Sequence, residues 1–304
     1  CNYISEVRNL HKAAKDARIE GIPTEELRRL TRSTKYVVVD GDSLWKIAAR
    51  VYGNGALPGT PGNRRFIQRL IARLADETHV VSLDTGVRFD DHEDFGDLPS
   101  DFDFVLHLAV ARSGEPDFDS DLRANAEAAG LLMTHCRTAK AFLHCSTTGV
   151  YHPKGHEPIV ETDPLGDNHR VMMPTYSIAK IAAEAVVRFA ARQLGLPTVI
   201  ARLNTPYGNN GGWMYYHLLM MKNGVEIAVH SDAPSVYTPI HEDDIARIFP
   251  ALCEHAKVPA EIVNVCGQEH VSIEEWCGYL GELCGLEPKF KKTDATLESV
   301  MSDN

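Results

Sequence analysis

The sequence predicts an α/β protein in which a parallel sheet is covered by helices. Residues 103–110 are a short apolar run suited to a buried strand, and residues 141–151 begin with an apolar stretch that reads as a second strand. Helical patterns follow each of them, at residues 121–136 and 177–194, where apolar side chains recur every three or four positions. Strand, helix, strand, helix in this order predicts parallel strands joined by helical crossovers.

Tyr176 and Lys180 lie one helical turn apart in the run PTYSIAKIAAEAVVRFAARQLGL. A free phenol ionises near pH ~10, and a fixed positive charge beside it favours the phenolate. The pair can therefore serve as an acid and base catalyst at neutral pH. The alternative is an ordinary amphipathic helix with both side chains in solvent.

The segment AFLHCSTTGVY, residues 141–151, reads as a strand that ends in a polar turn. Together with Tyr176 and Lys180, it resembles the extended short-chain dehydrogenase/reductase superfamily, also called NAD-dependent epimerase/dehydratases. The resemblance extends from about residue 79 to the end. It includes RLNTPYG at 202–208 and YTPIHEDDIARI at 237–248. It implies a Rossmann-like doubly wound parallel sheet with a smaller C-terminal substrate-binding region.

The resemblance also assigns catalytic roles. Thr147, three residues before the Val-Tyr pair, matches the catalytic Ser or Thr, and Ser146 is the neighbouring candidate. The hydroxyl would bind the substrate oxygen while Tyr176 moves its proton. Lys180 would hold the nicotinamide ribose and lower the pKa of Tyr176.

Cys145 lies beside this turn and could be a nucleophile, although packing is the favoured interpretation.

Further residues match cofactor positions of the family. Asn125 matches an asparagine in the helix before the catalytic strand, and His107 to Ala109 match a turn beside the cofactor. Asp84 ends the expected strand 79–85, where a carboxylate binds the adenosine ribose and repels a 2′-phosphate, so NAD is expected rather than NADP. Asp97 and Leu98 resemble an adenine-contacting pair. A solvated loop position is the alternative for each acid.

The phosphate-binding turn departs most from the family pattern. The helix 64–74 follows GNGALPGTPGN, and the strand before that turn would have to be residues 50–53. Gly59 and Gly62 have the expected spacing, but Gly55 lies one position too far upstream. Two prolines within the turn remove amide donors that would otherwise bind phosphate. A glycine-rich loop without a ligand is the alternative.

We expect three regions: an atypical helical N-terminal extension at 1–46, an NAD-binding Rossmann domain at 47–200, and a mainly substrate-binding region at 201–304. Two helices are predicted in the extension, as a dimerisation or capping element. Residues 35–55 resemble the first half of a LysM carbohydrate-binding module, without its second half. We interpret VVVDG within them as an extra or replaced strand.

The substrate is the least defined part of the prediction. Family members that act on nucleotide sugars usually carry an arginine at the position of Tyr237, and its absence argues for a less charged substrate. Dehydratases of the family have Asp-Glu after the catalytic Thr, where this chain has Thr148 and Gly149, so elimination is disfavoured. The further candidates for substrate contact are Asn204, Tyr207 and Trp213.

Composition fits this interpretation. The chain has 42 acidic against 31 basic residues, which argues against nucleic acid as a partner, and no membrane span or signal sequence is recognised. Its seven scattered cysteines predict reduced side chains, a cytoplasmic location and no metal site. We expect a homodimeric oxidoreductase or epimerase that acts on a small hydroxyl or carbonyl compound. An inactive dinucleotide-binding scaffold or sensor is the alternative, and a nucleotide-sugar epimerase a lesser one.

Overall fold

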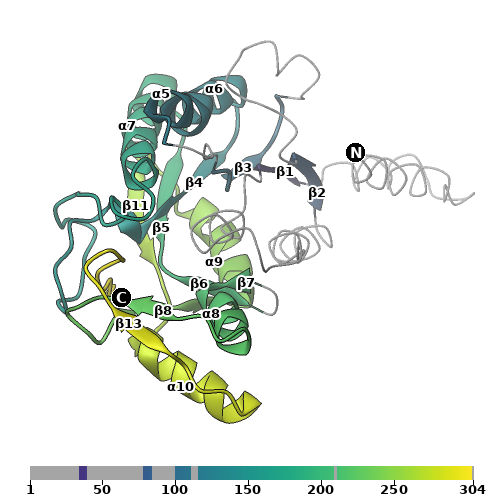
Figure 1. Cartoon of the computed structure of the whole chain (residues 1–304). Helices are drawn as coiled ribbons and strands as arrows, with labels where there is room; N and C mark the ends of the chain where they lie inside the picture. Colours follow the sequence, from purple (N-terminus) through teal and green to yellow (C-terminus); the bar gives the residue numbers. More distant parts are fainter. Residues whose placement is uncertain (1–33, 40–77, 84–99, 111–115, 209–210, 303–304) are drawn as a thin grey trace, which may run out of the picture. The chain divides into compact units, whose positions relative to one another are not determined.

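The computed structural model describes residues 34–39, 78–83, 100–110, 116–208 and 211–302 (Figure 1). The chain divides into two compact units, Cys1–Thr34 and Lys35–Asn304. The two predicted N-terminal helices lie outside the described residues. The second unit contains the sheet and the C-terminal region described below.

A six-stranded sheet forms the centre of the second unit, with the strand order β11-β5-β4-β3-β1-β2. The pairs β1/β3, β3/β4, β4/β5 and β5/β11 are all parallel, as predicted. The strands are β1 (Thr34–Val39), β2 (Thr78–Leu83), β3 (Phe104–His107), β4 (Ala141–Thr147), β5 (Thr198–Leu203) and β11 (Glu261–Val265).

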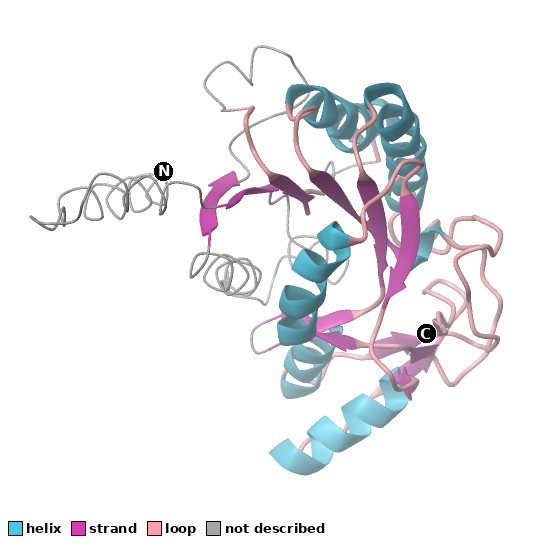
Figure 2. Ribbon diagram, turned by 180° about the vertical axis from the view of Figure 1, so that it is seen from behind, coloured by secondary structure: helices cyan, strands magenta, loops and turns pink. Residues whose placement is uncertain are grey.

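Helices cover both faces of this sheet, as views from opposite sides show (Figures 1 and 2). One face is covered by α6 (Ala128–His135) and α7 (Tyr176–Leu194), and the other by α9 (Glu242–Glu254). Successive residues of β4 point to opposite faces, so Phe142 belongs to the first core and Leu143 to the second. The predicted α/β class and its doubly wound sheet are confirmed.

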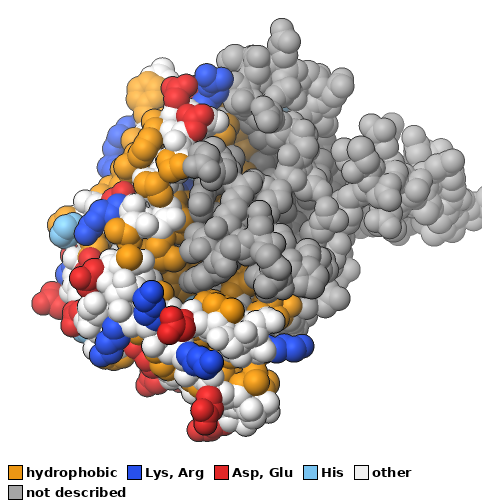
Figure 3. All heavy atoms as spheres, in the orientation of Figure 1, with side chains coloured by type: hydrophobic (Ala, Val, Ile, Leu, Met, Phe, Trp, Pro, Cys, Tyr) orange, Lys and Arg blue, Asp and Glu red, His pale blue; other side chains and the backbone are white. Residues whose placement is uncertain are grey.

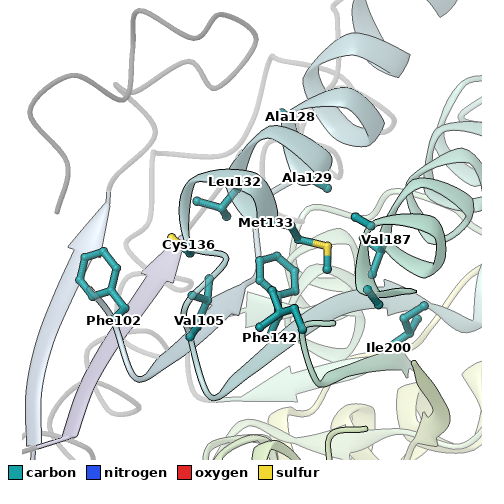
Figure 4. Packing of buried hydrophobic residues seen from close by; sticks show 14 residues of the cluster. Phe102, Val105, Ala128, Ala129, Leu132, Met133, Cys136, Phe142, Val187 and Ile200 are labelled. Carbon is teal, nitrogen blue, oxygen red and sulfur yellow. The ribbon is translucent and has the colours of Figure 1, made fainter. Parts of the chain in front are cut away.

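The core between the sheet and α6 and α7 is closely packed (Figure 4). Leu132 and Met133 of α6 meet Val105 and Phe142 of the sheet, and all four are fully buried. The two helices can approach because Gly130 has no side chain. A Cβ there would lie 2.7 Å from Cγ1 of Val186 in α7. This packing fixes α7, which carries Tyr176 and Lys180, against the sheet.

The helix before β4 contains a π-helical turn. It begins as α5 (Phe118–Leu122), continues through the π turn Arg123–Glu127 and ends as α6. The sequence predicted one helix over 121–136 but gave no signal for the wider turn. Such turns are rare and are often found at functional sites.

The order of the sheet reverses at β1, because β2 lies on one side of it and β3 on the other. In open α/β sheets, ligands bind beyond the carboxyl ends of the strands at such a reversal. β1 contains part of VVVDG, which agrees with the interpretation of this run as an extra or replaced strand. The sheet thus includes residues of the stretch 1–46 that we expected to precede the dinucleotide-binding domain.

The C-terminal region has a core of its own, formed by buried residues such as Tyr237 and Trp276. Ser272 and Glu275 form a capping box at the start of α10. The elements are β6 (Pro206–Gly208), β7 (Gly211–Gly212), α8 (Trp213–Lys222), β8 (Ile227–Val229), β9 (Val236–Tyr237), β10 (Ile240–His241), β12 (Val271–Ser272), α10 (Ile273–Cys284) and β13 (Phe290–Lys292).

Charged side chains of both signs are interspersed on the described part of the face in Figure 3. None of the described helices is long and apolar enough to cross a bilayer.

Candidate active site

Thr147 and Tyr176 meet at the carboxyl end of β4. Thr147 is the last residue of that strand, and Tyr176 is the first residue of α7. The Thr147 hydroxyl accepts a hydrogen bond from the Gly149 amide at 3.1 Å, and it is also hydrogen-bonded to the Tyr176 phenol. The structure thus brings together a hydroxyl and a phenol that lie far apart in the sequence.

The start of α7 is tied to the neighbouring helix, which fixes the position of Tyr176. The Thr175 hydroxyl donates to Oδ2 of the buried Asp121 in α5 at 2.6 Å. The Tyr176 amide donates to the Met173 carbonyl at 3.0 Å. Met173 also packs against the Tyr176 ring in a small apolar cluster with Val110.

Burial raises the pKa of the Tyr176 phenol to about 12, although the hydrogen bond from Thr147 opposes the shift. This differs from the expectation that Lys180 lowers that pKa. The Lys180 ammonium is directed to backbone carbonyls instead. In the protein without ligands, Tyr176 is therefore a protonated phenol at neutral pH and is suited to donate a proton.

Lys180 lies one turn after Tyr176 and is buried, and its own pKa is lowered by that burial. Its ammonium donates to the Cys145 carbonyl at 3.0 Å and to the Ala109 carbonyl at 3.4 Å. These carbonyls belong to β4 and to the segment after β3. An ammonium has three donors, so two carbonyls leave one for a ligand. A free ammonium donor fits the hydroxyl groups of the ribose of a dinucleotide.

Ser146, the second hydroxyl candidate, contacts a different residue of α7. Its hydroxyl donates to Oε1 of Glu184 at 2.6 Å. Glu184 in turn accepts from Nε of Arg202 at 3.0 Å and from Nη2 at 2.7 Å, and both side chains are nearly inaccessible. The Ser146 hydroxyl proton is thus used by a carboxylate farther along α7, whereas Thr147 contacts the phenol at the start of that helix. Ser146 belongs to a buried ion-pair network.

His107 is the last residue of β3 and contacts the neighbouring strand β4. Its Nδ1 lies 3.0 Å from Nδ1 of His144, its register partner in β4. Burial lowers the pKa of His107 to about 3, so the imidazole is neutral. The backbone carbonyl of Ala109, two residues further on, accepts a hydrogen bond from Lys180.

Asn125 lies in the π turn and is buried. Its amide donates to the Asp121 carbonyl at 2.7 Å. Since Asp121 also accepts from Thr175, Asn125 supports the helix that holds the start of α7.

Two of the expected substrate residues contact the C-terminal segment, residues 296–302. The Tyr237 hydroxyl donates to the Glu298 carbonyl at 3.1 Å, and the Asn204 amide donates to the Ser302 hydroxyl at 2.9 Å. Both side chains are buried. Trp213 packs edge-on against Tyr237, with ring centroids 5.1 Å apart. These three residues therefore form part of the packing of the C-terminal region.

Tyr207 packs on the His241 ring, with centroids 5.2 Å apart, and it remains partly accessible. It is thus the one expected substrate residue among these four that is not buried or packed into the C-terminal core. Six of the expected cofactor residues lie outside the described residues: Gly55, Gly59, Gly62, Asp84, Asp97 and Leu98.

His169 is a residue of the site that the sequence analysis missed. Its ring lies edge-on to Tyr176, with centroids 4.9 Å apart. The loop that carries His169 has no strand or helix pattern, so the sequence offered a single indication that a side chain lies here, namely the glycine at position 149. Gly149, so close to Thr147, leaves space beside the turn for another side chain.

Cysteine and metal chemistry receive little support from the described residues. Burial raises the pKa of the Cys145 thiol to about 11, which keeps it protonated. No group of three or more His, Cys, Asp or Glu side chains in the described ranges could hold a metal ion. The six cysteines in those ranges are free thiols.

Residues 86–266 match the model of the NAD dependent epimerase/dehydratase family. The chain belongs to this family. The match confirms the resemblance drawn from Thr147, Tyr176 and Lys180. It also includes RLNTPYG and YTPIHEDDIARI.

Solved structures of similar fold are consistent with this membership. UDP-glucuronic acid 4-epimerase from Bacillus cereus, in complex with UDP-glucuronic acid and NAD, has a TM-score of 0.65 at 20% identity. That match covers 89% of this chain and 90% of that one. The dTDP-glucose 4,6-dehydratase DesIV from Streptomyces venezuelae, with NAD bound, has a TM-score of 0.65 at 18% identity, covering 89% and 88%.

A curated relative from Arabidopsis thaliana is a trifunctional UDP-glucose 4,6-dehydratase, UDP-4-keto-6-deoxy-D-glucose 3,5-epimerase and UDP-4-keto-L-rhamnose reductase. It is 23% identical over 216 residues, which are 67% of this chain and 31% of that protein. The chain therefore spans about a third of the length of this relative.

Proposed function

We propose that this chain is an NAD-dependent oxidoreductase or epimerase that acts on a small hydroxyl or carbonyl compound. The observation that carries the proposal is the hydrogen bond between Thr147 and Tyr176, with Lys180 one turn away at the carboxyl ends of β3 and β4. These ends lie beside the reversal of strand order, where α/β folds bind ligands.

In this mechanism, NAD supplies the chemistry of hydride acceptance and return when it is bound. The chain's own residues handle the proton. Tyr176 donates the phenol proton to the oxygen of a carbonyl substrate, or removes the proton from a hydroxyl substrate in the reverse direction. Thr147 orients that oxygen with its hydroxyl, and the Lys180 ammonium provides a donor for the cofactor's ribose.

NAD rather than NADP is part of the proposal. Several solved structures of the same fold contain NAD, among them UDP-glucose 4-epimerase from Thermus thermophilus. Asp84 follows β2 directly in the sequence, and its carboxylate there would repel a 2′-phosphate. Asp84→Ala should therefore narrow the preference for NAD over NADP. Thermal shift with NAD and NADP side by side measures that preference. Equal binding of both by the parent protein would mean that Asp84 is not at the ribose.

The site disfavours elimination of water. Thr148 and Gly149 stand where dehydratases of the family carry Asp and Glu, so the carboxylates used for elimination are missing from that turn. Dehydration needs groups that protonate a leaving hydroxyl and abstract a carbon-bound proton. Redox exchange between alcohol and carbonyl, or epimerisation through a transient ketone, would need the proton transfer of Tyr176 together with hydride acceptance or return by bound NAD.

A nucleotide-sugar epimerase is the second candidate, because the solved structures of similar fold include epimerases with bound UDP-sugars. The position expected to hold a diphosphate-binding arginine is Tyr237, which is buried and bonded to Glu298. We therefore favour a substrate without a nucleoside diphosphate. The cytoplasmic location, the homodimer and the three-region division stay predictions.

The proposed function is tested by following NADH absorbance while the NAD-loaded protein is mixed with a panel of small alcohols, and the NADH-loaded protein with carbonyl compounds. Epimerisation returns the hydride and leaves NADH absorbance unchanged, so the same alcohols are also analysed for their epimers by chiral chromatography. Turnover that disappears in Tyr176→Phe supports it. A protein that binds NAD but turns over no compound of either panel, with Tyr176→Phe indistinguishable, supports the inactive scaffold instead.

A further inference from the structure

His169 occupies a space that only glycine leaves open. An added Cβ at Gly149 would lie 2.0 Å from Cε1 and 2.4 Å from Nδ1 of the His169 ring. Such distances are far inside van der Waals contact, so any other residue at position 149 would push the imidazole away. The ring is thus seated against the backbone of the turn that follows Thr147.

Hydrogen bonds determine which ring nitrogen of His169 carries a proton. The Ser177 hydroxyl donates to the Gly149 carbonyl at 2.8 Å, which uses its single proton. His169 Nδ1 lies 2.9 Å from the same hydroxyl oxygen and must therefore donate to it. His169, Ser177 and Gly149 form a chain of hydrogen bonds from the turn of Thr147 to the first turn of α7.

The loop that carries His169 is held on both sides. The His169 amide donates to the Asp167 carboxylate at 3.1 Å. Asn168 donates to the Glu298 carbonyl at 3.2 Å and accepts from the Glu298 amide at 3.2 Å. These contacts order the loop before a substrate arrives, and a side chain on an ordered loop can hold a neighbour in one position.

We propose that His169 is a positioning residue of this site, which acts through Tyr176 and Ser177 to keep the phenol at the Thr147 hydroxyl. The imidazole packs edge-on against the phenol ring, at an interplanar angle of 64°, while its Nδ1 anchors the first turn of α7. The proposal rests on the proposed function, since it concerns the same site.

The first test needs no substrate. Tyrosine is labelled with ¹³C at Cζ, and the Tyr176 resonance in the NAD-loaded protein is identified by its loss in Tyr176→Phe. We expect His169→Ala to shift and broaden that resonance because the ring loses its packing partner. Gly149→Ala should have the same effect because it displaces the imidazole while retaining it in the chain. An unchanged resonance in both variants overturns the proposal, whether or not a substrate has been found.

The second test compares two conservative variants. The amide nitrogen of asparagine can replace Nδ1, so His169→Asn keeps the bond to Ser177, whereas His169→Gln places its amide one bond too far. We expect kcat to fall by about 10- to 100-fold in His169→Gln and His169→Ala, with KM and NAD affinity nearly unchanged, and to recover partly in His169→Asn. Equal losses in His169→Asn and His169→Ala overturn the anchoring role.

A double variant separates this role from space filling. If His169 acts as proposed, Gly149→Ala combined with His169→Ala is no worse than either change alone, because both remove the same contact. If the added methyl restores kcat to the wild-type value, the imidazole serves only to fill space, and the proposal is wrong. If Tyr176→Phe leaves turnover unchanged, the proposed function is wrong. The resonance test would still report on the positioning role of His169, so the two failures can be distinguished.

Discussion

Ser146 Oγ lies 2.6 Å from Glu184 Oε1 in α7, while the next residue in the strand, Thr147, is bonded to Tyr176 at the start of the same helix. Two neighbouring hydroxyls of one strand therefore have separate roles. The first satisfies a buried carboxylate, and the second reaches the phenol that we propose transfers the proton.

Ser146→Ala should lower the free energy of unfolding and leave kcat unchanged, whereas Thr147→Val should lower kcat and leave the free energy of unfolding nearly unchanged. A hydrogen bond to a charged group contributes about 1.5–3 kcal/mol, so Ser146→Ala is expected to lower the free energy of unfolding by about that amount. Thr147→Val keeps the shape of the side chain and should reduce kcat at least tenfold. Denaturant unfolding and NADH-coupled turnover measure the two effects. Loss of turnover in a folded Ser146→Ala protein would contradict the separation.

Glu184→Gln is expected to be much more damaging to stability than its conservative chemistry suggests. The Arg202 guanidinium would remain buried without a counter-charge, and breaking a buried pair in this way costs about 3–5 kcal/mol. Asp119→Asn is the matched control, because it breaks the exposed pair with Arg123 one turn away on a helix surface. Urea unfolding should distinguish the two variants clearly. Equal midpoints would mean that the Glu184 pair adds nothing to stability.

The sequence predicted the parts of this site that depend on local periodicity. Helical spacing correctly indicated that a helix carries Tyr176 and Lys180, and the segment 141–151 correctly indicated a strand that ends in a polar turn; the structure places the end of the strand at Thr147. The sequence left Ser146 and Thr147 as alternatives, because both residues contact α7, and which hydroxyl meets Tyr176 and which meets Glu184 depends on how the strand packs against that helix.

Other features depend on contacts between distant segments. His169 lies in an irregular loop whose position is set by Glu298, far along the chain. Tyr237 is buried by that same C-terminal segment. A resemblance of motifs placed Tyr237 at a substrate position, but the motif carries no information about what packs over it.

The pH dependence should differ between the two directions of reaction. Burial raises the pKa of Tyr176 to about 12, so the acid form persists throughout the neutral range and the base form grows tenfold with each pH unit below that value. We expect kcat/KM for alcohol oxidation to rise with pH between about 7 and 10, and carbonyl reduction to stay flat there. Oxidation that reaches a plateau below pH 8 would show a much more acidic phenol in the NAD-loaded protein.

Tyr176→Phe should abolish turnover while it leaves the fold and NAD affinity nearly unchanged, because only the proton-transfer group is lost. Lys180→Ala should weaken both turnover and cofactor binding, since the ammonium links the segment after β3 to β4 and offers a donor to the ribose. Steady-state kinetics and calorimetric titration with NAD test the pair. Activity of Tyr176→Phe within about threefold of wild type would remove Tyr176 from its proposed role.

The last prediction concerns nucleotide sugars. A diphosphate needs compensating charge, and hydrogen bonds to charged groups contribute about 1.5–3 kcal/mol each, so a missing arginine weakens binding by one to two orders of magnitude or more. Tyr237 is 3% exposed and donates to Glu298, so it offers a diphosphate no charge and no accessible donor. We expect no saturable binding of UDP- or GDP-sugars below millimolar concentration when the NAD-loaded protein is titrated calorimetrically. Tyr237→Arg should not create such binding, since the guanidinium would be forced into a buried aromatic cluster and should lower stability instead. A micromolar dissociation constant for any nucleotide sugar would show that another cation binds the diphosphate, and would make the epimerase candidate the better description.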